Sequence, residues 1–268
     1  MMNMNIYAKF VACFSFILYS ISAFCESNSS QDSKMESWNT KKSADIIEYL
    51  FDQIPLKEKK ILSIGSDWGI DFYLADKFGL QIVDCGTNSN LVAALNKKTP
   101  ERLRHLVSFE LCPSYNALNY PDESFDIVFY RMNDFQNLIE ISHESRRLLK
   151  KNGLFIVLDC YVWKKDIEES DKKLYGAERF SHIVNEEQFK ELFEKNNLAL
   201  VSTRDDSHLG IKNAQRTLEI FGNKNPKSQV VLSLIFDDKQ EDIRDGYLSQ
   251  LKALEAGELK MLRFVTQK

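Results

Sequence analysis

The chain has 268 residues, of which 44% are hydrophobic and 28% are charged. This length and composition are those of a globular domain with a substantial core, and they exclude a disordered or fibrous protein. The formal net charge of −4 is spread along the chain without a basic block, so no nucleic-acid partner is expected.

Residues 1–25 differ in character from the rest of the chain. Met1–Lys9 is polar with one lysine, and an apolar run over Phe10–Phe24 follows it. This pattern predicts a secretory signal peptide cleaved near Cys25–Glu26, and hence a secreted protein or one of the secretory pathway. An uncleaved membrane anchor is the alternative, for which the run is short. Residues 26–40 are polar and serine-rich and predict a flexible leader, so the folded domain is expected over residues 41–268.

Helix-like and strand-like segments alternate through this domain. In chain order they are a helix at Lys42–Phe51, a strand at Lys60–Gly65, a helix at Ile70–Phe78, a strand at Leu80–Cys85, a helix at Leu91–Lys97, strands at Leu106–Cys112 and Phe125–Tyr130, a helix at Ile139–Lys150, a strand at Gly153–Cys160, a helix at Glu186–Asn196, a strand at Leu198–Arg204, a helix at Gln240–Glu255 and a strand near Leu259–Thr266. Ser228–Phe236 fits either a strand or a buried helix, and the residues between Arg204 and Ser228 give mixed signals. The alternation predicts an α/β fold, a doubly wound and mostly parallel sheet of seven strands with right-handed crossovers.

Three segments carry a resemblance to a known family: ILSIGSDWG (Ile61–Gly69), SFDIVFYR (Ser124–Arg131) and LLKKNGLFIVLD (Leu148–Asp159). They resemble the first strand with its glycine loop, the fourth strand, and the turn into the fifth strand of class I S-adenosylmethionine-dependent methyltransferases. FSHIVNEEQFKELFEKNNL (Phe180–Leu198) and the helix and strand within Tyr247–Lys268 are similar to the phosphoethanolamine N-methyltransferase branch. The resemblance implies a Rossmann-like methyltransferase fold with an antiparallel last strand and S-adenosylmethionine as the cofactor.

The glycine loop departs from the family pattern, which is an acidic residue, one position, and then G-x-G-x-G. Gly65 and Gly69 match this pattern, but Ser63 replaces the acidic residue and Asp67 replaces the middle glycine. A side chain and a charge at Asp67 intrude where backbone approaches the cofactor. The alternative interpretation is a tight turn between strand and helix that binds no ligand.

The carboxylates that hold the adenosine end are altered as well. Gly86 occupies the position of the ribose carboxylate, and Asp84 stands two residues earlier, where a shift of the alignment would make it the ribose ligand. Cys112 occupies the position of the adenine-side aspartate. The residues that the resemblance assigns to cofactor binding are therefore Ser63, Gly65, Gly69, Asp84, Gly86, Cys112 and Arg131.

The transfer step in the phosphoethanolamine branch is associated with a tyrosine and a histidine. Residues 26–48 contain no tyrosine, and Gln136 occupies the histidine position, where an amide orients a substrate but does not act as a base. Arg179 is the candidate phosphate ligand and Lys252 the candidate second cation, each with a solvated surface side chain as the alternative. The implied substrate is a small amine or phosphobase.

Three of the five cysteines lie beyond residues 1–25, namely Cys85, Cys112 and Cys160. Their spacing and that of the four histidines match no metal motif, so no metal is expected. In the implied fold Cys85 and Cys112 end neighbouring strands. An oxidising compartment then allows a disulfide across the mouth of the adenosine pocket.

Two functions follow from these features. The first is a small-molecule N-methyltransferase with an eroded cofactor site. The second is a secreted, catalytically inactive protein that uses the fold as a scaffold for a ligand or a protein partner, because the methyl donor is made in the cytosol. A nucleotide-dependent oxidoreductase on a similar sheet fits less well, because the LKKNG turn and the terminal strand do not suit it.

Overall fold

The computed structural model describes residues 49, 51–52, 54–65, 68–87, 89–131, 135–165, 167–170, 183–222 and 240–268. The predicted signal peptide, the leader, most of the helix expected at Lys42–Phe51 and the segment Ser228–Phe236 lie outside these residues. Within the described part of the chain, no helix has the length and apolar character needed to cross a membrane.

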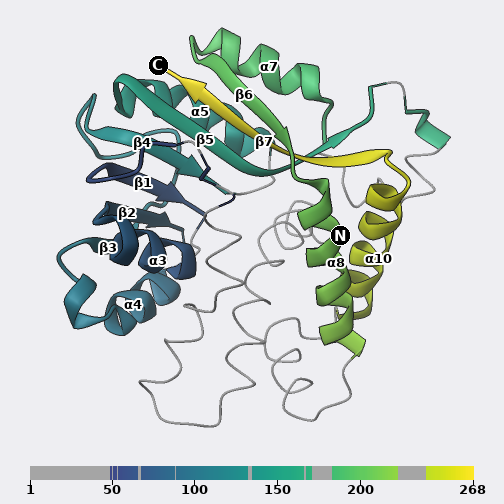
Figure 1. Ribbon diagram of the computed structural model, residues 1–268, viewed down its shortest axis with the longest axis horizontal. Helices are drawn as coiled ribbons and strands as arrows, with labels where there is room; N and C mark the ends of the chain where they lie inside the picture. Colours follow the sequence, from purple (N-terminus) through teal and green to yellow (C-terminus); the bar gives the residue numbers. More distant parts are fainter. Residues whose placement is uncertain are drawn as a thin grey trace.

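Seven strands form one sheet in the order β3-β2-β1-β4-β5-β7-β6 (Figure 1). The strands are β1 (Lys60–Ile64), β2 (Gln81–Gly86), β3 (Val107–Leu111), β4 (Phe125–Tyr130), β5 (Leu149–Trp163), β6 (Ala199–Asp205) and β7 (Leu259–Gln267). The pairs among β1 to β5 are parallel, whereas β7 runs antiparallel to both β5 and β6. The expected doubly wound sheet with an antiparallel last strand is confirmed.

The helices of the described residues are α3 (Trp68–Phe78), α4 (Ser89–Lys98), α5 (Phe135–Leu148), α7 (Glu186–Lys195), α8 (Ser207–Gly222) and α10 (Gln240–Glu255). Local sequence explains one boundary well. Asn185 precedes α7, and its side chain accepts a hydrogen bond from the backbone N–H of Gln188. The Gln188 side chain in turn accepts a hydrogen bond from the backbone N–H of Asn185. This reciprocal cap satisfies two N–H groups that a helix start otherwise leaves without partners.

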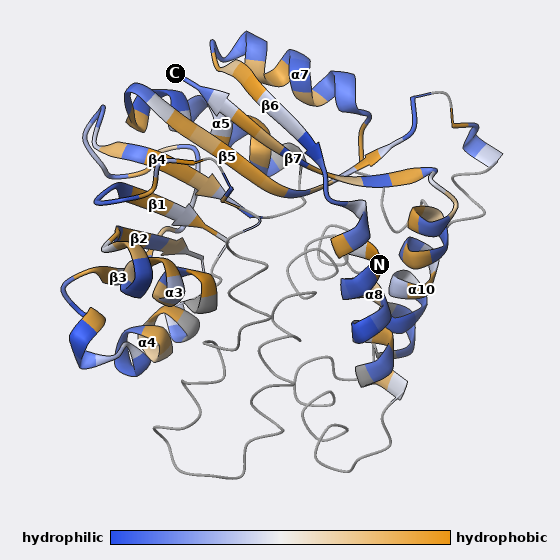
Figure 2. Ribbon diagram, viewed as in Figure 1, coloured by the Kyte–Doolittle hydropathy of each residue, from blue (hydrophilic) through white to orange (hydrophobic). Residues whose placement is uncertain are grey.

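The two faces of the sheet carry separate cores because successive side chains on a strand point in opposite directions. Leu62, Val128 and Phe155 pack with α5 and α7 on one face. Ile61, Ile127 and Ile156, each one residue away, pack with α3 on the other face. Figure 2 shows the resulting pattern, in which β4 and β5 are largely hydrophobic and the outer sides of the helices are hydrophilic.

The helix pair α8 and α10 extends the fold beyond β7, and Figure 1 shows the two helices side by side. They share a third apolar cluster with the end of β5. This cluster includes Tyr161 and Trp163 of β5 and Tyr247 of α10. Helix α8 was not expected from the sequence. Gly210 in α8 explains part of this difference, because a Cβ there would lie only 3.3 Å from the Met261 sulfur. The glycine permits close packing on β7, which sequence patterns do not show.

Candidate functional site

The residues predicted to bind the cofactor gather at the carboxyl ends of the parallel strands. Gly65 follows β1, Gly86 ends β2, Cys112 follows β3 and Arg131 follows β4. Backbone hydrogen bonds join the ends of neighbouring strands. The N–H of Arg131 donates to the Ile64 carbonyl at 2.9 Å, and the N–H of Cys112 donates to the Gly86 carbonyl at 2.9 Å. This edge is where open α/β sheets bind ligands.

Gly65 has the conformation that the turn after β1 requires. Its φ is +120°, in a region that side chains rarely adopt, and a Cβ would overlap the carbonyl oxygen of Arg131. The turn therefore brings the ends of β1 and β4 into backbone contact. Gly69 lies in the first turn of α3, whereas Asp67 lies outside the described residues.

Two predicted site residues are buried beneath this edge. Ser63 of β1 and Asp84 of β2 are register partners, with exposed fractions of 2% and 0%. Asp71 of α3, which is 1% exposed, packs against both and was not predicted from the sequence. Burial raises the pKa of Asp71 well above its ordinary value, and repulsion by Asp84 and a hydrogen bond with Asp84 add to the rise, while a hydrogen bond with Ser63 opposes it. Asp84 therefore takes part in a buried carboxyl pair and is not exposed at the sheet edge.

The Asp71 pair makes a pH-dependent prediction for an Asp71→Asn variant. The folded chain keeps a proton on Asp71 that the unfolded chain releases near pH 4. The stability that this proton supports is full below the unfolded pKa and is lost as pH rises through the folded pKa. Asn needs no proton, so the free energy of unfolding of the variant, relative to wild type, should increase between pH 5 and pH 8. Urea titrations across this range measure it.

Asp126→Asn is the control for this experiment. Burial acts to raise the pKa of Asp126, but hydrogen bonds from the Lys60 N–H and the Lys150 ammonium and the charge of Lys59 lower it below its ordinary value. Its titration therefore ends below pH 5, and the Asp126→Asn difference should be flat from pH 5 to pH 8. Parallel curves for the two variants would contradict the assignment of a proton to Asp71.

Arg131 is held by an ion pair at the site. Its Nε donates to the Asp159 carboxylate at 3.0 Å, and the two side chains are 9% and 23% exposed. Asp159 has a φ of +55° and lies where the pairing of β5 with β7 shifts register between Val157 and Cys160. Such bulges turn a side chain away from the regular strand pattern, which explains why sequence periodicity did not single out Asp159.

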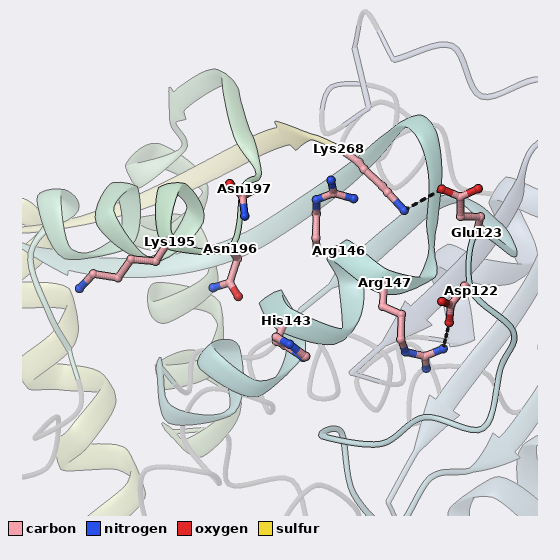
Figure 3. A pocket seen from close by; sticks show the side chains of 9 residues that line it. All are labelled: Asp122, Glu123, His143, Arg146, Arg147, Lys195, Asn196, Asn197 and Lys268. Carbon is pink, nitrogen blue, oxygen red and sulfur yellow. Dashed lines mark hydrogen bonds and ion pairs between the residues drawn. The ribbon is translucent and has the colours of Figure 1, made fainter.

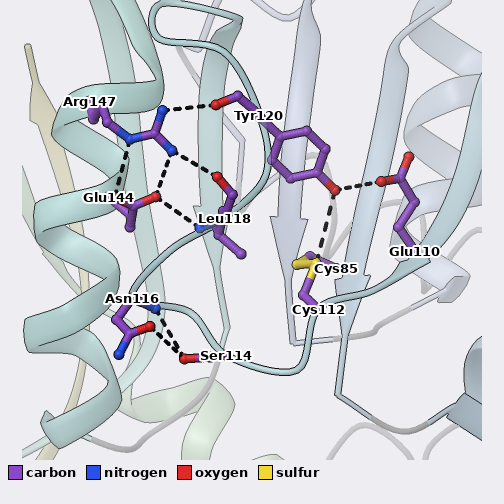
Figure 4. Close-up of a disulfide and its surroundings, with 9 residues drawn as sticks. All are labelled: Cys85, Glu110, Cys112, Ser114, Asn116, Leu118, Tyr120, Glu144 and Arg147. Carbon is purple, nitrogen blue, oxygen red and sulfur yellow. Dashed lines mark hydrogen bonds and ion pairs between the residues drawn. A yellow bond between two sulfur atoms is a disulfide. The ribbon is translucent and has the colours of Figure 1, made fainter.

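Cys85 and Cys112 form a disulfide, which the sequence had left open (Figure 4). Their Cα atoms are 5.5 Å apart. The bridge is not placed across the mouth of a pocket, however, since the residues are 0% and 7% exposed and pack in the apolar cluster with Leu62, Ile64 and Tyr130. The bridge that the sequence allowed is therefore present, but it lies in the core and not across the mouth of a pocket. The third cysteine, Cys160, is free and buried.

No contact among the described residues joins the remaining candidates, Gln136, Arg179 and Lys252, to the predicted cofactor residues. Arg179 lies outside the described residues. Gln136 is in the first turn of α5, but its side chain is not among those that the structure describes. Lys252 is exposed in the last turn of α10, and its ammonium makes no ion pair with the residues that the structure describes. The substrate-binding and transfer residues thus stay predictions. Among the described residues, no group of three or more metal-ligating side chains gathers.

A pocket of about 770 Å³ lies near the amino-terminal end of β4, away from the carboxyl ends of the parallel strands (Figure 3). It is lined by Asp122, Glu123, His143, Arg146, Arg147, Lys195, Asn196, Asn197 and Lys268. Its basic residues belong largely to the last turns of α5 and α7, where cations compensate the helix dipole. Arg147 and Lys268 are already paired with Asp122 and Glu123. None of the predicted cofactor residues lines this pocket.

Comparison with known sequences supports the same family. Residues 62–157 match the model of a methyltransferase domain. The chain is 26% identical over 215 residues to phosphoethanolamine N-methyltransferase 1 of Zea mays. The aligned region covers 78% of this chain and 41% of the relative. The corresponding protein of Arabidopsis thaliana is 22% identical over 214 residues. The chain thus spans about two fifths of the length of these curated relatives.

Solved structures share the fold. The phosphoethanolamine N-methyltransferase 2 of Haemonchus contortus, in complex with phosphomonomethylethanolamine and S-adenosylhomocysteine, aligns with a TM-score of 0.62 at 19% identity, over 85% of this chain and 58% of that chain. The geranyl diphosphate C-methyltransferase of Streptomyces coelicolor aligns with a TM-score of 0.63 at 12% identity, over 92% of this chain and 86% of that chain. Residues 62–157 of the chain therefore match a methyltransferase domain, and the chain shares the fold of these solved methyltransferases.

Proposed function

We propose that the chain is a methyltransferase for a small amine or phosphobase, with a cofactor site that relies on backbone groups more than on carboxylates. The observation that carries this proposal is the Gly65 turn. It keeps the positive φ and the close backbone contact with Arg131 at the end of β1, although the residues around it have changed. Relatedness to the phosphoethanolamine branch supports the substrate class.

The described residues at the carboxyl ends of the parallel strands fit the methionine end of the cofactor, but those predicted to hold its ribose offer no exposed carboxylate. Gly65 and the start of α3 would hold the methionine end of the cofactor through backbone groups, as glycine loops before helices do for anionic groups. At the ribose, Gly86 offers no carboxylate and Asp84 is buried with Asp71. S-adenosylmethionine would supply an already activated methyl group. The chain's own task is to align an acceptor nitrogen with it and to accommodate the amine proton.

Calorimetry with S-adenosylhomocysteine on the full chain tests this function. Micromolar binding, followed by transfer of labelled methyl to phosphoethanolamine or ethanolamine, supports the proposal. Comparison of these two acceptors shows whether phosphate is recognised. An Arg179→Gln variant that affects only the phosphorylated acceptor would support Arg179 as the phosphate ligand. Absence of binding at millimolar ligand would overturn the enzyme assignment.

The second candidate is a secreted scaffold without catalysis. The absence of a ribose carboxylate at Gly86 and the burial of Asp84 favour it, as does the predicted signal peptide at residues 1–25. A scaffold of this kind would be folded, would fail to bind S-adenosylhomocysteine, and would be found outside the cytosol. Detection of the mature chain in the culture medium of expressing cells tests the localisation.

A Gly86→Asp variant should bind S-adenosylhomocysteine more tightly than wild type. Gly86 ends β2 at the position where the family has its ribose carboxylate. A carboxylate there gains charge-assisted hydrogen bonds to the ribose hydroxyls, which predicts about a tenfold lower Kd. Calorimetry measures the Kd, and a thermal melt confirms that the variant is folded.

Gly86→Asn is the matched control, since it adds a side chain of the same size without the charge. It should gain less than Gly86→Asp. Equal or weaker binding by a folded Gly86→Asp variant would contradict a ribose contact at this position.

A further inference from the structure

The Cys85–Cys112 bridge joins the ends of the two strands that carry the predicted adenosine positions, Gly86 and Cys112. Cys85 precedes Gly86 at the end of β2, and Cys112 follows the end of β3. The N–H of Cys112 also donates to the Gly86 carbonyl at 2.9 Å. The disulfide and this single hydrogen bond are thus adjacent tethers between the ends of two parallel strands.

The sulfur atoms lie inside the protein and do not obstruct the edge of the sheet. Cys85 is 0% exposed and Cys112 is 7% exposed, and both belong to the apolar cluster beneath α5. The bridge therefore acts by fixing backbone positions. Cys112 is the more exposed of the two residues.

The segment that leaves Cys112 is anchored again eight residues later (Figure 4). The Tyr120 hydroxyl donates to Glu110 at 2.8 Å and lies 3.9 Å from the Cys112 sulfur. The carbonyl oxygens of Leu118 and Tyr120 accept hydrogen bonds from Arg147 of α5. Residues 112–120 therefore form a loop with one end held by the disulfide and the other by α5. Reduction removes only the first of these anchors.

We propose that the bridge is a redox-controlled tether that orders residues 112–120 for the adenosine end of the cofactor. In the oxidised chain the loop is held in place before the ligand arrives, so binding orders fewer residues. A dithiol reductant breaks the S–S bond, each sulfur gains an electron and a proton, and the reductant becomes a disulfide. The reduced chain must then order the loop on binding. This inference rests on the proposed function, because it concerns affinity for that cofactor.

Calorimetry with S-adenosylhomocysteine on the full chain, before and after treatment with dithiothreitol, tests the tether. Thiol counting confirms that reduction is complete. We expect the reduced chain to bind about three- to tenfold more weakly, which is the range for ordering a few side chains and backbone bonds. A Cys85→Ala/Cys112→Ala double variant should bind like the reduced chain and should not respond to the reductant. Cys160→Ala keeps the bridge and should respond as wild type does.

Hydrogen exchange of residues 112–120 in the ligand-free chain separates the tether from the proposed function. Reduction should speed exchange in this segment and leave β4 unchanged. Faster exchange without ligand binding in either state would overturn the proposed function while supporting the tether. Equal exchange in the two states, or measurable binding with the same affinity in the two states, would overturn the tether.

Discussion

A Gly65→Ala variant should lose about 3 to 5 kcal/mol of its free energy of unfolding, the largest effect of a single methyl group that we expect in this protein. Two costs add at this position. The φ of +120° is strained for any residue with a Cβ, and the added Cβ would overlap the carbonyl oxygen of Arg131. Because domains of this kind have only about 5 to 15 kcal/mol in total, the variant should be marginally stable.

The backbone of Arg131 cannot easily move away from a Cβ at Gly65. The N–H of Arg131 donates to the Ile64 carbonyl, and the Arg131 side chain is paired with Asp159, so the neighbouring backbone is held on both sides. Moving it would disturb the pairing of β1 with β4 at the centre of the sheet. Chemical unfolding followed by circular dichroism measures the loss.

Gly257→Ala is the matched control for Gly65→Ala. Gly257 also has a positive φ, of +72°, but a Cβ there would have no neighbour within 4 Å. Its substitution should cost only the backbone strain of about 1 kcal/mol. Similar losses in the two variants would show that the contact with Arg131 contributes nothing, and would remove the main structural argument for a cofactor-binding turn after β1.

Sequence patterns predicted the elements whose signals are local. The apolar run at Phe125–Tyr130 and the amphipathic pattern at Gln240–Glu255 gave β4 and α10 with the bounds that the structure has. By contrast, Lys150 was expected in a helix and lies in β5, because Leu149 pairs with Phe125 and draws the chain into the sheet. Pairing across the sheet decides this boundary, and no local propensity encodes it.

The candidate site was predictable in position but not in chemistry. Strand ends and glycines placed Gly65, Gly86 and Arg131 together. The burial of Asp84 depends on its register with Ser63 and on the side of the sheet that α3 covers. Asp71, the partner that decides the charge of this pair, gives no signal in a helical sequence pattern beyond one acidic residue in the first turn. Such carboxyl pairs emerge only when the three elements are assembled.

An Arg147→Met variant is expected to lose about 3 kcal/mol of unfolding free energy, because it leaves a buried carboxylate without its cation. Arg147 donates to both carboxylate oxygens of Glu144, at 3.2 and 2.7 Å, and the Glu144 side chain is only 6% exposed. The same guanidinium donates to the carbonyl oxygens of Leu118 and Tyr120, at 2.9 and 2.8 Å. Arg147 therefore holds the loop after β3 against α5 together with Glu144, which accepts a hydrogen bond from the Leu118 N–H at 3.1 Å.

The geometry of the guanidinium matters as well as its charge. Arg147→Lys keeps the charge, but an ammonium cannot span the carboxylate and two carbonyl groups at once. We expect it to recover only part of the loss. Adding Glu144→Gln to Arg147→Met removes the uncompensated charge, so the double variant should lose less than the sum of the two single variants.

Arg102→Met provides the exposed counterpart for this series. Arg102 also makes two hydrogen bonds to one carboxylate, that of Asp76, but the two side chains are 60% and 40% exposed. Exposed pairs contribute about 0 to 1 kcal/mol, so this variant should be nearly as stable as wild type. If Arg147→Met costs no more than Arg102→Met, then the Arg147 guanidinium does not hold the loop after β3. The loop would then depend more on the Cys85–Cys112 bridge and on the hydrogen bonds that Leu118 and Tyr120 make to Glu144 and Glu110.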